Sequence, residues 1–218
     1  GAGGSADIGG LDRIAGVIAG RFKQLGAKDE LIEPGPEVYK MFDTPGKIGR
    51  MVRATFAGTG TRKILLIAHM DTVYPRGMLE KQPFRIDGDR VWGLGIADDK
   101  HGITVILHAL NMLRSLDFRE YGTLTVLINA DEEVSSPGSR SLITRLGEEH
   151  DAVLSFEGGG GPSVDRVRLA TSGIGSATIT VRGRASHAGA APERGVNSLY
   201  ELAHQVLQAR DLSDRKVG

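Results

Sequence analysis

The stretch Lys63-Ile-Leu-Leu-Ile-Ala-His-Met-Asp71 decides the fold of this chain. Its apolar part is rich in β-favouring residues and is too short for a helix, so it predicts a strand that is buried on both faces. Such a strand belongs to a sheet that is covered by helices on both sides. The stretch ends in a histidine and an acid, at the sheet edge where ligands gather in folds of this kind.

The segments around this strand alternate between helix and strand. Apolar spacing and segment length predict helices over residues 11–25, 101–116 and 139–150, the first ended by Gly26. Two further short apolar runs predict strands over residues 123–129 and 152–156. This order indicates an α/β fold with a mixed or parallel sheet flanked by helices.

The pattern changes after the glycine run at residues 158–161, so we place a domain boundary near residue 165. Gly175 to Val181 alternates small or polar residues with apolar ones, which predicts an antiparallel strand with one solvated face. Val196 to Leu207 returns to helical spacing. This second piece holds only about fifty residues, which is marginal for an independent core.

The opening residues, Gly1 to Ser5, carry no element pattern and are interpreted as a loop outside the fold. We therefore expect their removal to have little effect.

Composition excludes several classes of function. The 27 basic and 27 acidic residues cancel, so no net field attracts nucleic acid or an anionic membrane. The chain has no cysteine, hence no disulfide and no thiolate-bound metal. Its apolar runs are far shorter than the ~20 residues of a membrane helix. We expect a soluble protein, and the sequence leaves the compartment open between cytoplasm and periplasm.

Acids and a histidine follow each predicted strand or precede a helix. They are His69 with Asp71, the pair Asp98-Asp99, the run Asp131-Glu132-Glu133, and Glu157. Several anions at one edge repel each other, and burying them is costly unless a cation compensates. A ligand set of histidine and carboxylate without sulfur suits zinc, cobalt or manganese, and two ions sharing one carboxylate would use the whole set.

Each of these residues taken alone has a simpler interpretation. A single histidine or acid after a strand is more often a solvated loop residue than a ligand. The coincidence of four such clusters favours the metal site. The remaining histidines are interpreted as structural or surface residues: His101, His108, His150 and His204. Gly93-Leu-Gly95 lacks the flanking pattern of a phosphate loop, so nucleotide binding is not expected.

Five motifs occur in order along the chain: Ile67-Ala-His69-Met-Asp71-Thr-Val, Trp92-Gly-Leu-Gly-Ile-Ala-Asp98-Asp-Lys100-His-Gly, Asn129-Ala-Asp-Glu132-Glu133, Ser155-Phe-Glu157 and Ala185-Ser-His187-Ala-Gly-Ala-Ala-Pro. Together they resemble the M20 metallopeptidases, and within them the glutamate carboxypeptidase group. The resemblance runs from about residue 11 to the last residue. It implies a zinc-peptidase catalytic domain over residues 1–165 and the start of an inserted α+β lid or dimerisation domain over residues 166–218.

The resemblance also implies a metal centre with two Zn²⁺ ions per subunit, where Co²⁺ or Mn²⁺ could substitute. Its ligands would be His69 and Glu157 on one ion, Glu133 on the other, and Asp98 as the bridge between both.

Three further residues receive roles from the same resemblance. Asp71 would orient His69, and Glu132 would be the general base that takes a proton from the attacking water and returns it to the leaving amine. His187 would reach the partner subunit's site and help to hold the oxyanion, which requires a homodimer formed through the lid. On general grounds alone, a histidine in a turn of small residues is more often a surface residue.

The implied activity is hydrolysis of an amide bond next to a free carboxylate in a small peptide or N-acyl amino acid, releasing a C-terminal glutamate or a similar residue. An N-acyl-amino-acid deacylase or a dipeptidase of the same family is the first alternative. In the family the chain continues past the lid to a final metal-binding histidine, so a non-catalytic metal-binding or dimerisation fragment is an alternative of another class. A structural module without metal is the third.

Overall fold

The computed structural model describes residues 4–36, 40–42, 44–158, 167–170, 177–210 and 212. The chain divides into two compact units, Gly1–Arg166 and Val167–Gly218. The domain boundary expected near residue 165 lies among residues 159–166, outside the described ranges. In the part of the chain that is described, no helix has the length and hydropathy needed to cross a bilayer.

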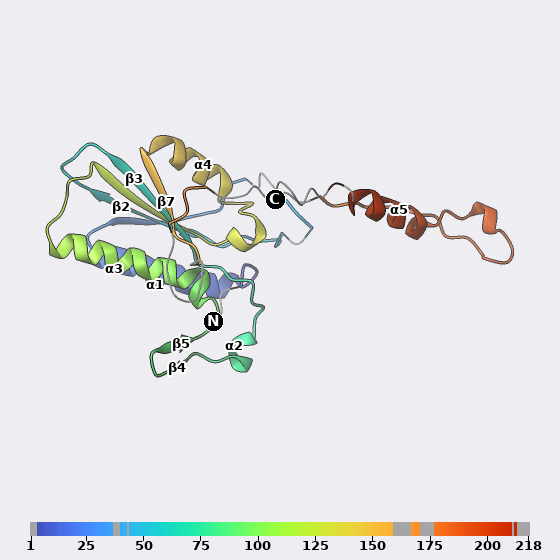
Figure 1. Ribbon diagram of the computed structural model, residues 1–218, viewed down its shortest axis with the longest axis horizontal. Coiled ribbons are helices and arrows are strands. Elements are labelled where there is room, and N and C mark those ends of the chain that lie inside the picture. The colour runs from blue at the N-terminus through green and yellow to red at the C-terminus, as the bar shows by residue number, and fades with distance from the viewer. Residues whose placement is uncertain are drawn as a thin grey trace. The chain divides into compact units, whose positions relative to one another are not determined.

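The first unit is built on a five-stranded sheet with the strand order β1-β2-β6-β3-β7 (Figure 1). The strands are β1 (Lys28–Ile32), β2 (Met51–Ala57), β3 (Lys63–His69), β6 (Thr123–Asn129) and β7 (Ala152–Ser155). Strand β3 runs parallel to β6 and β7, whereas β2 is antiparallel to both β1 and β6. The predicted mixed sheet is therefore confirmed, and the strands predicted at β3 and β6 have the expected bounds.

Helices cover both faces of this sheet, as Figure 1 shows. Helices α1 (Ile8–Gln24) and α3 (His101–Ser115) pack on one face, and α4 (Arg140–Glu149) packs on the other. Along β3, Leu66 and Ala68 join the core under α1 and α3, and Leu65 joins the core under α4. Since neighbouring residues of a strand point to opposite faces, this alternation confirms that β3 is buried on both sides.

Helix α1 shows how local chemistry sets the bounds of an element. Its N-cap is Asp7, whose carboxylate accepts a hydrogen bond from Gly10 N at 3.2 Å. The helix ends at Gln24, and Gly26 follows with a φ of 91°, a left-handed conformation that suits glycine. The predicted stop is confirmed, and the start lies three residues before the predicted position because the cap precedes the first buried residue, Gly10.

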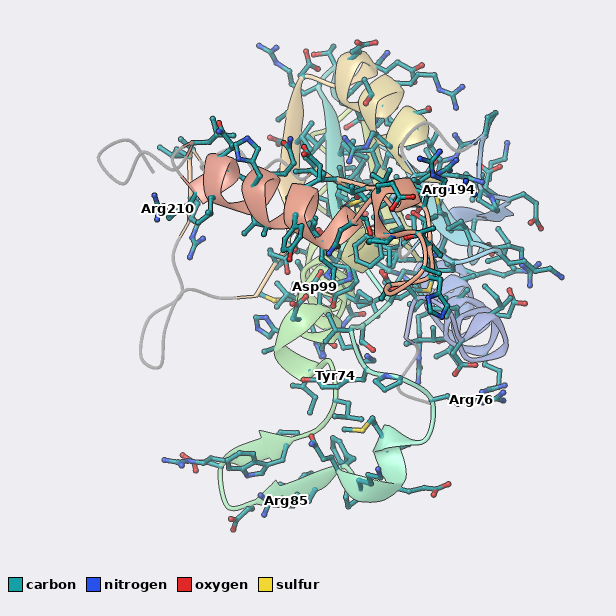
Figure 2. All side chains as sticks on the ribbon, turned by 90° about the vertical axis from the view of Figure 1, so that its right-hand side faces the viewer. Tyr74, Arg76, Arg85, Asp99, Arg194 and Arg210 are labelled. Atoms are coloured by element: carbon teal, nitrogen blue, oxygen red, sulfur yellow. The ribbon has the colours of Figure 1, made fainter. Side chains whose placement is uncertain are left out.

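Several elements were not predicted. Strand β1 is mostly polar and lies at the sheet edge, which accounts for its weak periodic signal. A short helix α2 (Met78–Lys81) and a hairpin of β4 (Arg85–Asp87) and β5 (Arg90–Trp92) stand away from the sheet, with Arg85 at the far end in Figure 2. The guanidinium of Arg85 lies 4.7 Å from the centroid of the Trp92 ring, an interaction within the hairpin.

The expectation that residues 1–5 lie outside the fold is wrong for the two of them that are described. Gly4 forms a parallel bridge with Thr72, and Ser5 is buried. Glycine is required at this approach because a Cβ atom at Gly4 would overlap the carbonyl oxygen of Tyr74. The N-terminal segment therefore packs on the chain that leaves β3.

The second unit contains one helix of more than a turn among its described residues, α5 (Ser198–Arg210), which confirms the helix predicted from Val196. A single turn, η3 (Pro192–Arg194), and a bridge between Arg184 and Val196 precede it.

The strand predicted over residues 175–181 is wrong where it can be compared. Residues 175 and 176 lie outside the described ranges, and Ala177 to Val181 form no strand. A strand exists only when its backbone groups bond to a neighbouring strand, and the described part of this unit offers none to pair with.

Replacing Phe22 by alanine should lower the free energy of unfolding by about 3–5 kcal/mol, because a large and fully buried ring is lost between α1 and the sheet. Urea denaturation measures the loss. The matched control on the same helix is Val17→Ala, which removes a side chain that is 64% exposed and should change stability by less than about 0.5 kcal/mol. Equal effects of the two variants would contradict this packing.

Candidate metal centre

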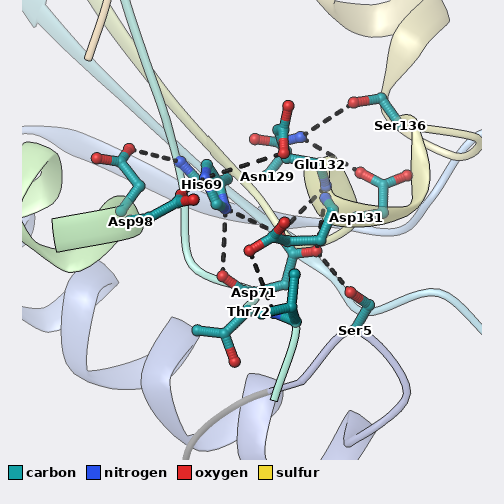
Figure 3. Close-up of polar contacts among 12 residues, drawn as sticks. Ser5, His69, Asp71, Thr72, Asp98, Asn129, Asp131, Glu132 and Ser136 are labelled. Carbon is teal, nitrogen blue, oxygen red and sulfur yellow. Dashed lines mark hydrogen bonds and ion pairs between the residues drawn. The ribbon is translucent and has the colours of Figure 1, made fainter. Parts of the chain in front are cut away.

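The acids predicted to gather do so around His69, the last residue of β3 (Figure 3). Its Nε2 atom lies 2.8 Å from Asp98 Oδ1, 3.7 Å from Glu157 Oε1 and 4.0 Å from Glu132 Oε2. Strands β3, β6 and β7 are parallel, so their carboxyl ends meet at this edge and bring together residues far apart in the sequence.

Three of the predicted ligands are close enough to share an ion. One ligand atom each from His69, Asp98 and Glu133 lies within 4.8 Å of the other two. Glu157, the fourth predicted ligand, lies beside His69. The structure thus places all four predicted metal ligands at one site, with Asp98 and Glu157 exposed, Glu133 half-buried and the imidazole 2% exposed.

Two adjacent aspartates in the turn η1 (Ile96–Lys100) point to different places. Asp98 is turned toward His69 and is largely exposed. Asp99 is fully buried at the start of α3 (Figure 2), where its carboxylate accepts hydrogen bonds from His69 N at 3.3 Å and Gly102 N at 3.2 Å. Burial raises the pKa of Asp99 to about 7, against the opposing effect of the bond from His69. Asp99 therefore ties β3 to α3 behind the site.

Asp71 lies behind the site and joins its parts. Its Oδ1 atom is 3.3 Å from His69 Nδ1, and its backbone oxygen is 3.2 Å from the same nitrogen. Its two carboxylate oxygens also accept hydrogen bonds from the backbone N–H groups of Glu132 and Glu133, each at 3.2 Å, and from the Ser5 hydroxyl at 2.8 Å. The fully buried carboxylate of Asp71 thus links the imidazole ring of His69 to the backbone of Glu132 and Glu133.

The pKa values of the acids and of His69 are shifted by burial and by the charges of their neighbours at this edge of the sheet. Burial lowers the pKa of His69, but Asp71 and Glu157 raise it by more, to about 11. Burial, and after it the charge of Asp98, raises the pKa of Glu133 to about 7. Burial also raises the pKa of Glu132, whereas the imidazolium of His69 lowers the pKa of Glu157 to about 2. Glu132 and Glu133 therefore hold a proton more strongly than a free glutamate does, whereas Glu157 stays ionised beside the positive charge of His69.

A divalent cation fits this arrangement. The donors are one imidazole nitrogen and several carboxylate oxygens, a set that suits zinc and related ions. An ion would offset the repulsion among the carboxylates and would replace the proton on His69 Nε2. The contact between Asp71 and Nδ1 leaves Nε2 as the nitrogen directed at the acids.

His187 lies in the second unit, so the geometry around His69 does not test its predicted role. It is exposed, and its Nδ1 atom accepts hydrogen bonds from the N–H groups of Gly189 at 3.2 Å and Ala190 at 3.0 Å.

The histidines set aside as structural or surface residues include one clear structural case. His150 links the end of α4 to the sheet, with Nδ1 2.7 Å from Leu146 O and Nε2 2.8 Å from the Thr125 hydroxyl. His108 is exposed on α3.

Sequence reasoning missed the contribution of Ser5 and assigned no role to Asp99. Nothing in the sequence signals the contact between Ser5 and Asp71, because the two are 66 residues apart.

Comparison with known proteins gives a family and several relatives. Residues 65–217 match the peptidase family M20/M25/M40. Carboxypeptidase G2 of Pseudomonas sp. (strain RS-16) is 47% identical over 168 residues, covering 77% of this chain and 40% of that protein. N-acetyl-L-citrulline deacetylase of Xanthomonas campestris pv. campestris is 30% identical over 148 residues, covering 67% of this chain and 37% of that protein. The chain thus spans about two-fifths of the length of these curated relatives.

Solved structures share the fold at low identity. A tripeptidase from Staphylococcus aureus subsp. aureus Mu50 superimposes with a TM-score of 0.60 and 19% identity, covering 94% of this chain and 52% of that one. Human carnosine dipeptidase 1 gives a TM-score of 0.55 and 18% identity, covering 69% of this chain and 33% of that one. At these identities the likeness supports the fold alone.

Ser5→Ala should weaken metal binding, because Asp71 loses the hydroxyl donor that helps to hold it against His69. Since changes behind metal ligands commonly cost 10–100-fold in affinity, we expect a rise of about tenfold in the Kd for Zn²⁺, measured by calorimetric titration.

The matched control for Ser5 is Ser115→Ala, which removes a serine hydroxyl bonded to the backbone of α3. It should leave the Kd unchanged. A Ser5→Ala protein that binds Zn²⁺ as tightly as this control would show that the N-terminal contact does not support the site.

Proposed function

The chain belongs to the peptidase family M20/M25/M40, and from this premise we propose that it is the metal-binding part of a zinc-dependent exopeptidase. The preferred reaction is hydrolysis of an amide bond next to a free carboxylate, with release of a C-terminal glutamate or a similar amino acid. The observation that carries the proposal is the convergence of His69, Asp98 and Glu133 on one point. The 47% identity to carboxypeptidase G2 supports the choice among the activities of the family.

We assign the zinc ligands as follows. His69 and Glu157 would hold one Zn²⁺, Glu133 would hold a second, and Asp98 would be shared by the two, while Asp71 keeps the imidazole in its orientation. Zinc bound by these residues would supply Lewis acidity toward the scissile carbonyl and would lower the pKa of bound water. Co²⁺ or Mn²⁺ suits the same oxygen-rich donor set.

Glu132 is the proposed general base. Its Oε2 atom lies 4.0 Å from His69 Nε2, beside the ligands, and its backbone is anchored to Asp71. The carboxylate takes a proton from water as the water oxygen bonds to the carbonyl carbon. When the carbon–nitrogen bond breaks, the same carboxyl group gives this proton to the leaving amine. Burial raises the pKa of Glu132, which favours its service as the acid in the second step.

The two units have different proposed roles. Residues 1–165 form the catalytic part, and residues 166–218 begin a lid or dimerisation domain. In a homodimer His187 would act in the other subunit, where it would donate a hydrogen bond to the developing oxyanion.

An N-acyl-amino-acid deacylase is the second candidate. The 30% identity to N-acetyl-L-citrulline deacetylase favours it, because that relative matches over two-thirds of this chain. Assays of the full-length gene product on acyl-glutamates, dipeptides and N-acetyl amino acids separate the candidates. Absence of turnover on every acyl-glutamate would refute the preferred reaction.

Glu132→Gln should lower kcat by about 10²–10⁴-fold, since the amide can neither take nor return the proton. KM and the amount of bound Zn²⁺ should stay close to those of the parent protein, because Glu132 is not assigned as a ligand. Steady-state kinetics and metal analysis of the same preparation measure both. Glu148→Gln, an exposed change on α4, is the control and should keep full activity. Loss of zinc in the Glu132 variant would contradict its role as the base.

Zinc should stabilise the parent protein and should do so less in Glu133→Gln. An ion present at a hundred times its Kd adds about 2.7 kcal/mol to the free energy of unfolding. Thermal unfolding with Zn²⁺ and with a chelator should therefore differ in Tm for the parent protein, and by much less for the variant. Equal Tm values of the parent protein under the two conditions would favour the structural module without metal.

A further inference from the structure

Asp131 is the acid of the Asp131-Glu132-Glu133 run that the proposed function leaves unused. It is 1% exposed, and its side chain contacts Asn129 at the end of β6 and the loop that follows this strand, not the other acids. Its Oδ2 atom accepts hydrogen bonds from Gly138 N at 2.7 Å and Ser139 N at 3.1 Å. Its Oδ1 atom lies 3.4 Å from the Asn129 side-chain nitrogen, the donor on that side. Figure 3 shows Asp131 on the opposite side of His69 from Asp98.

These bonds close the loop of residues 131–139. The backbone oxygen of Asp131 accepts a further hydrogen bond from Ser136 N at 2.7 Å, so the residue holds the loop through both its backbone and its side chain. Ser135 and Ser136 have φ values of 70° and 54°, a left-handed conformation that is unfavourable for residues other than glycine. A loop with two such residues in sequence keeps this shape only when other contacts hold it.

The closed loop carries the two residues that matter most to the proposed chemistry. Glu132 and Glu133 follow Asp131 directly, and their N–H groups bond to Asp71. The backbone of the two glutamates is therefore held on one side by Asp71 and on the other by the loop that Asp131 closes. If the loop closed by Asp131 opened, the carboxylates of Glu132 and Glu133 could turn away from His69 and Asp98.

We propose that Asp131 is a positioning residue that directs Glu132 and Glu133 into the metal centre through its hydrogen bonds to Gly138 N and Ser139 N. This role rests on the proposed function, because it has a consequence for catalysis only if Glu132 is the base and Glu133 a ligand. Asp131 itself touches neither metal nor substrate.

Two substitutions of Asp131 distinguish its role as a hydrogen-bond acceptor from an effect of its negative charge. In Asp131→Asn the amide oxygen can still accept from both backbone N–H groups. The new amide nitrogen then faces the side chain of Asn129, which can rotate its amide group so that the oxygen accepts this hydrogen bond. The hydroxyl groups of Ser136 and Ser139, which now accept from Asn129, would then donate to its oxygen. The Asp131→Asn variant would keep the loop closed without the negative charge, whereas Asp131→Ala removes the acceptor and leaves two buried N–H groups without a partner.

The experiment compares Asp131→Ala, Asp131→Asn and a control in the full-length gene product. The control is Asp151→Ala, because Asp151 also accepts a backbone hydrogen bond, from Lys63 N at 2.7 Å, but at the opposite end of β3. For each protein we would measure the Kd for Zn²⁺, kcat, KM and Tm, with the acyl amino acid that the parent protein hydrolyses best as substrate.

We expect Asp131→Ala to raise the Kd for Zn²⁺ by about 10–100-fold and to lower kcat by about 10²-fold, with KM changed less than about threefold. Asp131→Asn should restore the Kd and kcat to within about fivefold of the parent protein, since an amide oxygen replaces the carboxylate oxygen as acceptor. The control should keep the parent values of the Kd and kcat, whatever its Tm.

Two results would overturn the positioning role: an Asp131→Asn variant as defective as the Asp131→Ala variant, or an Asp131→Ala variant with the parent Kd and kcat. If the alanine variant does not fold, the asparagine variant decides alone, since retained zinc binding and turnover support the role and their loss refutes it. A parent protein that neither binds Zn²⁺ nor hydrolyses any substrate would instead refute the proposed function, and this role with it.

Discussion

The candidate site depends on the need to hold several carboxylates together at the end of a buried strand. Asp98, Glu132, Glu133 and Glu157 all approach His69, and their mutual repulsion must be offset for the fold to keep them there. The buried carboxylate of Asp71 holds the site mechanically, because it accepts hydrogen bonds from backbone N–H groups and a hydroxyl and contacts the imidazole, but its charge adds to the repulsion. The remaining negative charge faces outward, where a divalent cation can compensate it.

Neighbouring acids in this protein have different tasks because the backbone turns between them. Asp98 faces the ligands, whereas Asp99 is buried and joins β3 to α3. Glu132 and Glu133 face the centre, whereas Asp131 turns back to close its own loop. In each run, one acid stabilises the backbone that presents its neighbour. A site of this kind combines a rigid frame with exposed carboxylates, as the proposed reaction on a bound amide would require.

Much of the fold could be predicted because its signals are local. Burial within or against the sheet produces a clear apolar pattern in the sequence. This pattern is seen in the apolar runs of β3 and β6 and in the helical spacing of α1 and α3. The edge strand β1 and the hairpin β4–β5 bury little and left no such period, whereas β2 was not predicted although it is largely buried. The strand predicted over residues 175–181 shows the reverse case, since an alternating pattern produces a strand only beside a partner.

The sequence by itself determined the α/β order of elements, the family resemblance and the residue types that meet at the sheet edge. Parallel strands end at one edge, so acids that follow such strands converge whatever the loops between them do. Only the tertiary structure showed that Asp99 and Asp131 turn away from the centre to bond to the backbone, and that the buried Ser5 supports Asp71 from 66 residues away. Those choices depend on backbone turns and on hydrogen bonds between distant segments, and neither leaves a periodic trace in the sequence.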